Sequence, residues 1–191
     1  DLDHSNGRKR NTTAEVGTRT LESVLHLYDT ATRSVRELAL REPRKVSIYL
    51  CGPTVYGPAH LGHGRATVEY DILRRYLEWT GLDVQLVSNI TDIDDKIINR
   101  ANDEDRPWQD IATKCEAMWF KAMDGVNVGR PSENPHATDY VDEMVEMIGA
   151  LIDKGHAYES DGHVLFDVSS YGDYGKLSRR SLREMIAGAR V

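Results

Sequence analysis

The side chains with the clearest chemical potential lie in one run, Cys51-Gly-Pro-Thr-Val-Tyr-Gly-Pro-Ala-His-Leu-Gly-His63. The run holds one thiol, two imidazoles and three glycines among polar and turn-forming residues. An imidazole N–H can donate a hydrogen bond to a phosphate chain whose charge grows in a transition state. Gly62 has no side chain, so a bulky ligand can approach the backbone there. His60 and His63 are therefore candidate phosphate-binding residues.

The same residues allow plainer interpretations. A His-x-x-His pair can bind a metal, and on spacing alone two solvated histidines at the start of a helix are the more common case. Cys51, at the end of an apolar run, is on composition alone more often a small buried hydrophobic residue than a ligand. A single cysteine is not a zinc site, because zinc takes three or four protein ligands.

The predicted strands and helix on either side of this run indicate its position in the fold. Val46–Cys51 is short, apolar and β-branched, which is typical of a buried strand. A loop follows to about His60, then a helical pattern from Leu61 that Gly81 ends, and then a second strand at Asp83–Ser88. Strand, helix, strand at this spacing predicts parallel strands with a right-handed crossover. Ligands of such sheets bind at the carboxyl ends of the strands, beside helix N-termini that favour phosphate.

The rest of the chain is predicted to be mainly helical. Thr91 and Asp94 resemble the start of a capping box before Ile97, and a further helix is expected after Pro107. The other predicted elements are a short strand at 25–28, a turn at 30–33, a helix with an apolar face at 137–154, a hairpin formed by 157–159 and 163–167, and a last helix at 182–187.

Composition places the chain among ordinary globular proteins. Hydrophobic residues make up 40 % and charged residues 29 %, with a net charge of −7. This acidic balance gives no general attraction to nucleic acid. Residues 1–20 are polar and are expected to be a flexible leader. No apolar run is long enough to span a membrane and the first residues show no secretory signal pattern, so we expect a cytoplasmic protein. A disulfide between Cys51 and Cys115 is not expected there, and Cys115 is predicted to be a core residue.

Several segments resemble one enzyme family. His60-Leu-Gly-His63 resembles the HIGH signature of class I aminoacyl-tRNA synthetases. Four further segments are similar to the cysteinyl-tRNA synthetases: Leu27–Arg33, Tyr49–Tyr56, Asn89–Ile98 and Lys154–Tyr158. The similarity runs from about Leu25 to Val191. The fold it implies is α/β, a Rossmann-like parallel sheet with a helical insertion.

The resemblance implies a ligase that activates cysteine with ATP and Mg²⁺ and then transfers it to tRNA(Cys). By this resemblance Cys51 is a ligand of a Zn²⁺ ion that binds the substrate sulfur. A soft metal that prefers thiolate would separate cysteine from serine, which shape alone separates poorly. The other implied site residues are Gly52, Thr54 and Thr91 around the amino acid, and His60, Gly62 and His63 at the phosphates of ATP.

The sequence also departs from the family. Gly57 stands where the family commonly has Asp. The family's other zinc ligands, its KMSKS loop and its tRNA-binding helical domain have no counterpart up to Val191, and His136, His156 and His163 do not match those ligand positions. We therefore expect residues 21–191 to be the N-terminal part of the catalytic domain, with the start of the connective insertion. Such a chain should have an exposed sheet edge and should not form cysteinyl-adenylate at an appreciable rate by itself.

Three questions stay open at this stage. Asp92, Asp94 and Asp95 could border the amino-acid pocket, or cap and polarise a helix, and we favour capping for Asp94 and Asp95. One alternative is a related enzyme, the cysteine ligase of mycothiol biosynthesis, which joins cysteine to an amino sugar, although Lys96 and Ile97-Ile98 look more like the tRNA enzyme. A non-catalytic synthetase-like chain that binds a nucleotide or a partner protein is the other alternative.

Overall fold

The computed structural model describes residues 25–181, 183 and 185. The predicted leader at 1–20 lies outside the described residues, as does most of the predicted last helix at 182–187. Within the described part of the chain, no helix combines the length and the apolar character needed to cross a membrane.

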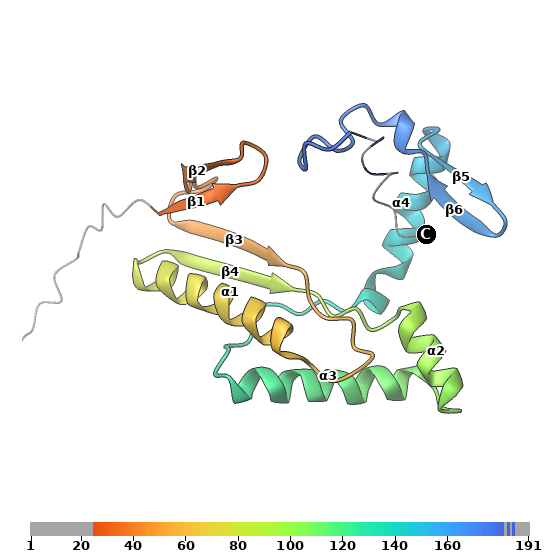
Figure 1. The fold of residues 1–191 in the computed structure, drawn as a ribbon, viewed down its shortest axis with the longest axis horizontal. Coiled ribbons are helices and arrows are strands. Elements are labelled where there is room, and N and C mark those ends of the chain that lie inside the picture. The colour runs from red at the N-terminus through yellow and green to blue at the C-terminus, as the bar shows by residue number, and fades with distance from the viewer. Residues whose placement is uncertain (1–24, 182, 184, 186–191) are drawn as a thin grey trace, which may run out of the picture.

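The predicted strand–helix–strand unit is confirmed. Strands β3 (Lys45–Leu50) and β4 (Asp83–Ser88) pair in parallel, and helix α1 (Leu61–Trp79) connects them. Figure 1 shows α1 lying along the two strands. Val46, Leu77 and Val84 form the small core between helix and sheet. Helix α1 ends at Trp79, and Gly81 follows it with a φ of +88°, a value that few other residues adopt.

A second core lies beyond the carboxyl ends of the strands. Helices α2 (Asp95–Asp103) and α3 (Trp108–Gly125) pack against each other there. Its buried members are Val55, Ile90, Ile97, Ala101, Ile111, Ala112 and Cys115. Cys115 is a free thiol that is only 1 % exposed, so its predicted core role is confirmed.

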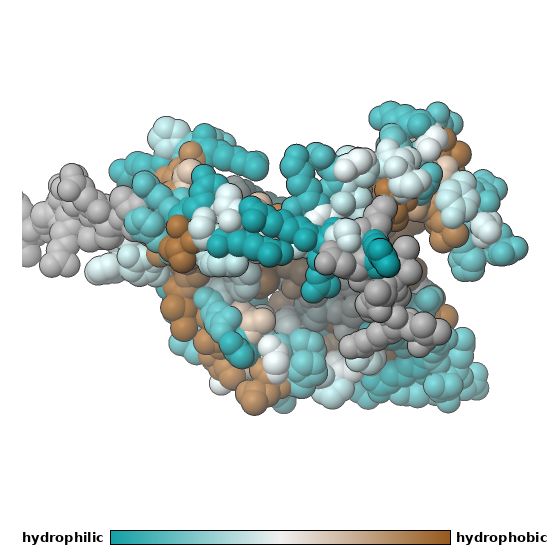
Figure 2. All heavy atoms as spheres, turned by 45° about the horizontal axis from the view of Figure 1, so that its top comes forward, coloured by the Kyte–Doolittle hydropathy of each residue, from teal (hydrophilic) through white to brown (hydrophobic). Residues whose placement is uncertain are grey.

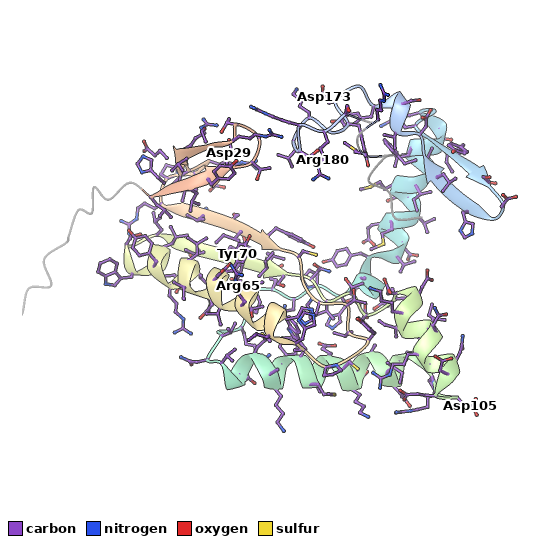
Figure 3. All side chains as sticks on the ribbon, viewed as in Figure 1. Asp29, Arg65, Tyr70, Asp105, Asp173 and Arg180 are labelled. Carbon is purple, nitrogen blue, oxygen red and sulfur yellow. The ribbon has the colours of Figure 1, made fainter. Side chains whose placement is uncertain are left out.

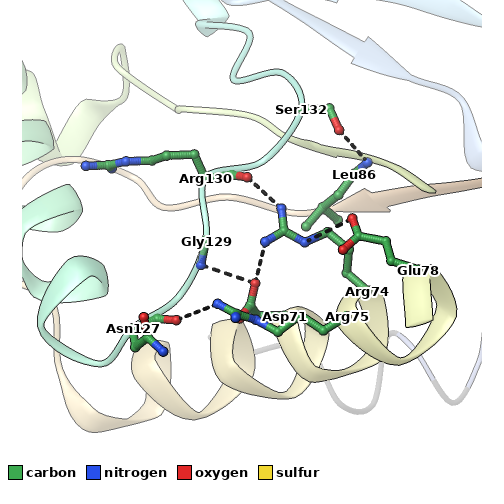
Figure 4. A network of polar contacts seen from close by, with 9 residues as sticks. All are labelled: Asp71, Arg74, Arg75, Glu78, Leu86, Asn127, Gly129, Arg130 and Ser132. Carbon is green, nitrogen blue, oxygen red and sulfur yellow. Dashed lines mark hydrogen bonds and ion pairs between the residues drawn. The ribbon is translucent and has the colours of Figure 1, made fainter. Parts of the chain in front are cut away.

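A buried carboxylate fixes the return of the chain onto α1. Asp71, 6 % exposed, accepts hydrogen bonds from Arg74 and Arg75, both at 2.6 Å, and from the backbone N–H of Gly129 at 3.1 Å. Arg74 also donates to the carbonyl of Arg130 at 2.6 Å, as Figure 4 shows. Such pairing is what makes a buried charge tolerable. The network holds the segment that then runs parallel to β4 through the bridges Val87↔Glu133 and Ile90↔His136.

Two antiparallel hairpins flank this centre. Strands β1 (His26–Asp29) and β2 (Ser34–Glu37) form the first, of which only β1 and its turn were predicted, because Ser34–Glu37 carries too little apolar signal. Strands β5 (Ala157–Ser160) and β6 (His163–Phe166) form the second, as predicted. Asp161 and Gly162 have φ values of 50° and 78°, which a tight two-residue hairpin turn requires. A short 3-10 turn, η2 (Val168–Ser170), follows.

The predicted helix at 137–154 is only partly correct. Residues Ala137–Tyr140 form a 3-10 turn, η1, and α4 begins at Val141 and ends at Asp153. Its apolar face is largely exposed, with Val145 at 62 % and Met147 at 67 %. Figure 2 shows hydrophobic residues at the surface of the part of the molecule formed by α4, β5 and β6. The spacing of apolar residues correctly predicted α4, but no other part of the described chain packs over most of its apolar face.

The start of α2 resolves part of the question about the three aspartates. Asp94, not Thr91, is the N-cap, and its Oδ1 accepts a hydrogen bond from the backbone N–H of Lys96 at 2.8 Å. Asp95 lies in the first turn of the helix, where a negative charge is favourable. Asp92 instead accepts hydrogen bonds from the backbone N–H and the hydroxyl of Thr138, at 3.1 and 2.5 Å. The predicted capping role of Asp94 is confirmed.

The cap gives a stability prediction. Asp94→Ala removes the acceptor of the Lys96 N–H and should lower the free energy of unfolding by about 1 kcal/mol. Asp94→Asn keeps an equally good capping oxygen and should stay within a few tenths of a kcal/mol of the parent protein. Thermal and urea unfolding of both variants measure the difference. Equal destabilisation by Ala and Asn would show that the charge, not the cap, matters at this position.

Candidate functional site

A cavity of about 300 Å³ opens at the carboxyl ends of β3 and β4. Its walls come from the loop after β3, the first turns of α1, the end of β4, the start of α2 and the middle of α3. The residues that line it are Cys51, Gly52, Pro53, Thr54, Tyr56, His63, Ala66, Thr67, Ser88, Lys96 and Trp119. This is the edge at which the sequence predicted a ligand to bind.

The loop after β3 is fixed to the segment after β4 by backbone hydrogen bonds. The N–H of Thr91 donates to the carbonyl of Pro53 at 2.9 Å, and the N–H of Val55 donates to the carbonyl of Thr91 at 3.1 Å. The side chain of Asn89 joins the two segments, since its Oδ1 accepts from the N–H of Gly52 at 2.9 Å and its Nδ2 donates to the Thr91 hydroxyl at 3.0 Å. The floor of the cavity is therefore held by main chain as well as by side chains.

Gly52 is required for this close approach. A Cβ at this position would lie 1.5 Å from the carbonyl oxygen of Asn89, which is backbone and cannot move aside alone. Gly52→Ala should therefore lower the free energy of unfolding by roughly 1–3 kcal/mol and distort the cavity. Gly57→Ala is the matched control in the same loop, because a Cβ there meets nothing within 4 Å. A Gly52→Ala variant as stable as Gly57→Ala in thermal unfolding would disprove the steric account.

The two histidines form a stacked pair at the start of α1. Their ring centroids are 3.7 Å apart and the rings are inclined by 16°. The Nδ1 of His63 accepts a hydrogen bond from the backbone N–H of His60 at 3.2 Å, so a neutral His63 ring carries its proton on Nε2. Burial lowers the pKa of His63 below its usual value, and the neighbouring charge of His60 lowers it further, which favours that neutral form at pH 7.

Helix α3 supplies the wall opposite α1. The Trp119 ring meets the His63 ring edge-on, with centroids 5.3 Å apart and an angle of 72° between the planes. The hydroxyl of Thr67 lies 3.0 Å from the sulfur of Met123 and donates to the His63 carbonyl at 3.0 Å. These contacts restrict the orientation of His63 before any ligand binds.

The structure brings together four of the seven predicted site residues. Cys51, Gly52, Thr54 and His63 line the cavity. His60 stacks on His63, and its ring lies where a side chain at Gly62 would be, 3.1 Å from that Cβ position. Thr91 is paired with Thr54 through a backbone bridge, and its hydroxyl is bonded to Asn89.

Cys51 follows β3 directly and is an exposed, free thiol. A thiolate at this position can serve as a ligand of a soft metal ion. Among residues 25–181, however, no three His, Cys, Asp or Glu side chains gather closely enough to hold an ion. Cys51 thus suits one position of a zinc site, and the described residues do not complete it.

Sequence reasoning did not predict seven of the lining residues as site residues: Pro53, Tyr56, Ala66, Thr67, Ser88, Lys96 and Trp119. Trp119 lies on a helix distant in sequence, and no local pattern reveals which face of that helix turns toward α1. Lys96 offered a signal, because a lysine in the first turn of a helix opposes the helix dipole.

A larger opening, of about 990 Å³, lies elsewhere, between Ala31 and residues 171–181. There Arg179 donates to the carbonyl of Ala31 at 3.0 Å, and Arg33 donates to the carbonyl of Ser178 at 3.3 Å. Figure 3 shows Asp173 and Arg180 near the hairpin that carries Asp29, on the other side of β3 from α1. None of the seven predicted site residues lines this opening, so size does not identify the functional site.

Comparison with known proteins identifies the family of the chain. A family model described as the class I (C) tRNA synthetase catalytic domain matches residues 37–191. The chain is 45 % identical over 168 residues to a cysteine--tRNA ligase of Syntrophobacter fumaroxidans, a match that covers 88 % of this chain and 34 % of the relative. It is 47 % identical over 169 residues to the cysteine--tRNA ligase of Maricaulis maris, covering 87 % and 37 %.

A third relative, the cysteine--tRNA ligase of Carboxydothermus hydrogenoformans, is 46 % identical over 167 residues, covering 87 % of this chain and 36 % of its own length. The chain therefore spans about a third of the length of these curated relatives. The family model includes both strands of the parallel pair and both histidines of the cavity region. The chain belongs to the class I (C) tRNA synthetase catalytic-domain family.

Proposed function

We propose that residues 21–191 form the N-terminal part of the catalytic domain of a cytoplasmic cysteine--tRNA ligase. The observation that supports this most is the cavity at the carboxyl ends of β3 and β4, because one thiol and one neutral imidazole line it together. The names of the relatives point to the same reaction.

The proposed reaction has two steps. A carboxylate oxygen of cysteine attacks the α-phosphorus of ATP, which is bound with Mg²⁺, and pyrophosphate leaves. A ribose hydroxyl of the terminal adenosine of tRNA(Cys) then attacks the carbonyl carbon of the adenylate, and AMP leaves.

In the first step His63 donates its Nε2–H to phosphate oxygen, where negative charge grows. His60 stacks on His63 and donates from the same helix start. Gly62 has no side chain, which leaves room for the His60 ring, and its backbone is proposed to contact the nucleotide. The N–H groups of the first turn of α1 add favourable electrostatics for phosphate.

The amino acid is proposed to lie between the loop after β3 and the segment after β4, bordered by Gly52, Thr54 and Thr91. Cys51 would contribute one thiolate to a Zn²⁺ ion whose remaining ligands come from outside the described cavity. When bound, that ion supplies a soft Lewis acid that prefers sulfur to oxygen.

Charging of tRNA tests the proposal directly. The complete product of the gene that encodes this chain should attach cysteine to tRNA(Cys) in the presence of ATP, and an amino-sugar acceptor should give no product. Cysteine transfer to the amino sugar alone would instead identify a mycothiol-type ligase. Binding of ATP without transfer to either acceptor would favour the non-catalytic alternative.

A further inference from the structure

The charge of the cavity lining is unusual for a site that receives a zwitterionic amino acid. Of the residues that line it, Lys96 is the one with a formal charge at pH 7, and no carboxylate lines it. Asp94 and Asp92 are engaged by Lys96 N–H and by Thr138. Within the described part of the chain the cavity is therefore suited to an anion.

The ammonium group of Lys96 is held but not neutralised. Its Nζ lies 5.3 Å from the centroid of the Tyr56 ring, a cation–π distance. The salt bridges of the described residues do not include Lys96. The nearest basic side chain on the same helix, Arg100, is by contrast paired with Glu104 at 2.6 Å. Lys96 thus keeps its charge available to a ligand.

The loop that carries the Tyr56 ring is itself held in place by α2. Arg100 of α2 donates to the carbonyl of Tyr56 at 2.6 Å, so the ring that contacts the Lys96 ammonium group is tied to the same helix. Lys96 stands in the first turn of α2, where the helix dipole disfavours a positive charge. The positive charge of Lys96 is thus kept at an unfavourable position, beside the Tyr56 ring and at the wall of a cavity suited to an anion. This placement indicates that Lys96 binds a negatively charged ligand.

We propose that Lys96 binds a phosphoryl oxygen of the substrate in this cavity, which His63 also lines. The inference rests on the proposed function and extends it, because it assigns to α2 a cationic contact of the phosphate, in addition to the neutral donors proposed on α1. Two sources carry the same chemistry: the phosphates of ATP, and the phosphodiester beside the terminal adenosine of tRNA.

Equilibrium binding separates the phosphate contribution from catalysis. The complete gene product is titrated with ATP and with adenosine, each with Mg²⁺, and with an oligoribonucleotide that ends in CCA. The variants are Lys96→Met, Lys96→Arg and, as the matched control, Lys121→Met, which changes an exposed lysine of α3 that does not line the cavity. Circular dichroism confirms that each variant is folded.

Lys96→Met should weaken binding of ATP or of the oligoribonucleotide by about 10- to 100-fold, the effect of one charge-assisted hydrogen bond, and leave adenosine binding unchanged. Lys96→Arg should recover most of the affinity. A selective effect on ATP assigns the nucleotide phosphates, and a selective effect on the oligoribonucleotide assigns the tRNA end.

Unchanged binding of both ligands in Lys96→Met, or an equal loss for adenosine, would overturn the inference. If ATP binding depends on Lys96 but the protein charges no tRNA, the proposed function is contradicted, whereas the phosphate-binding role of Lys96 is supported. Wild-type protein that binds neither phosphate ligand would overturn both.

Discussion

His63→Ala is expected to lower the rate of cysteine-dependent ATP–pyrophosphate exchange about 10²- to 10³-fold, the usual effect of removing one hydrogen-bond donor to a developing oxyanion. The ring is placed for this task by three contacts: the His60 N–H on Nδ1, the His60 ring on its face and the Trp119 ring at its edge. Together they fix the orientation of the ring, and the contact on Nδ1 leaves the proton of the neutral ring on Nε2. The measurement is the kcat of exchange in the complete gene product.

Two further variants separate chemistry from folding. His63→Gln keeps an N–H near the position of Nε2 and should recover part of the rate. His163→Ala removes an exposed histidine of β6, outside the cavity lining, and should leave the rate unchanged. An exchange rate within twofold of the wild type in a folded His63→Ala protein would rule out the proposed role.

Cys51→Ala is expected to remove zinc from the complete gene product. Losing a direct ligand should weaken metal affinity by more than the roughly 10- to 100-fold that follows loss of an outer-shell partner. Because zinc is proposed to select sulfur over oxygen, discrimination between cysteine and serine in the exchange assay should fall with the metal content.

The chain offers a matched control in its second thiol. Cys115→Ala also removes one sulfur, but from the core between α2 and α3, where Cys115 is 1 % exposed. It should lower stability modestly and leave the zinc content intact. Metal analysis of the purified proteins gives the result, and a Cys51→Ala protein with the wild-type zinc content would show that Cys51 is not a ligand.

The sequence predicted the part of the fold in which local pattern and tertiary environment agree. Val46 and Val84 lie in apolar, β-branched runs that are buried against α1. The residue pattern and the burial in the folded protein therefore both favour strands at these positions. Asp161-Gly162 specified a turn by its own backbone preference. At 34–37 there was no such agreement, because β2 is exposed along its whole length and lacks an apolar face.

Sequence reasoning predicted the site residues that lie close together in the chain, but not those that helix packing brings to the cavity. Cys51 and His63 share one loop and one helix start, so their spacing alone placed them at one edge of the sheet. Trp119 and Lys96 reach the cavity from α3 and α2. Their position depends on how those helices pack around Ile97 and Ile111, which residue spacing does not encode.

Asp94 illustrates a limit of motif reasoning. The spacing of Thr91 and Asp94 suggested that Thr91 starts the helix, whereas Thr91 is committed to the backbone bridge with Thr54. The carboxylate of Asp94 then takes the cap. A tertiary hydrogen bond decided between two residues of similar capping preference.

The central claim is that this cavity activates cysteine, and cysteine-dependent ATP–pyrophosphate exchange measures that step most directly. The assay uses the complete gene product with added zinc, and serine replaces cysteine in the control. We expect exchange with cysteine and none above background with serine. No exchange with either amino acid in a protein shown to be folded, or equal exchange with both, would contradict the account.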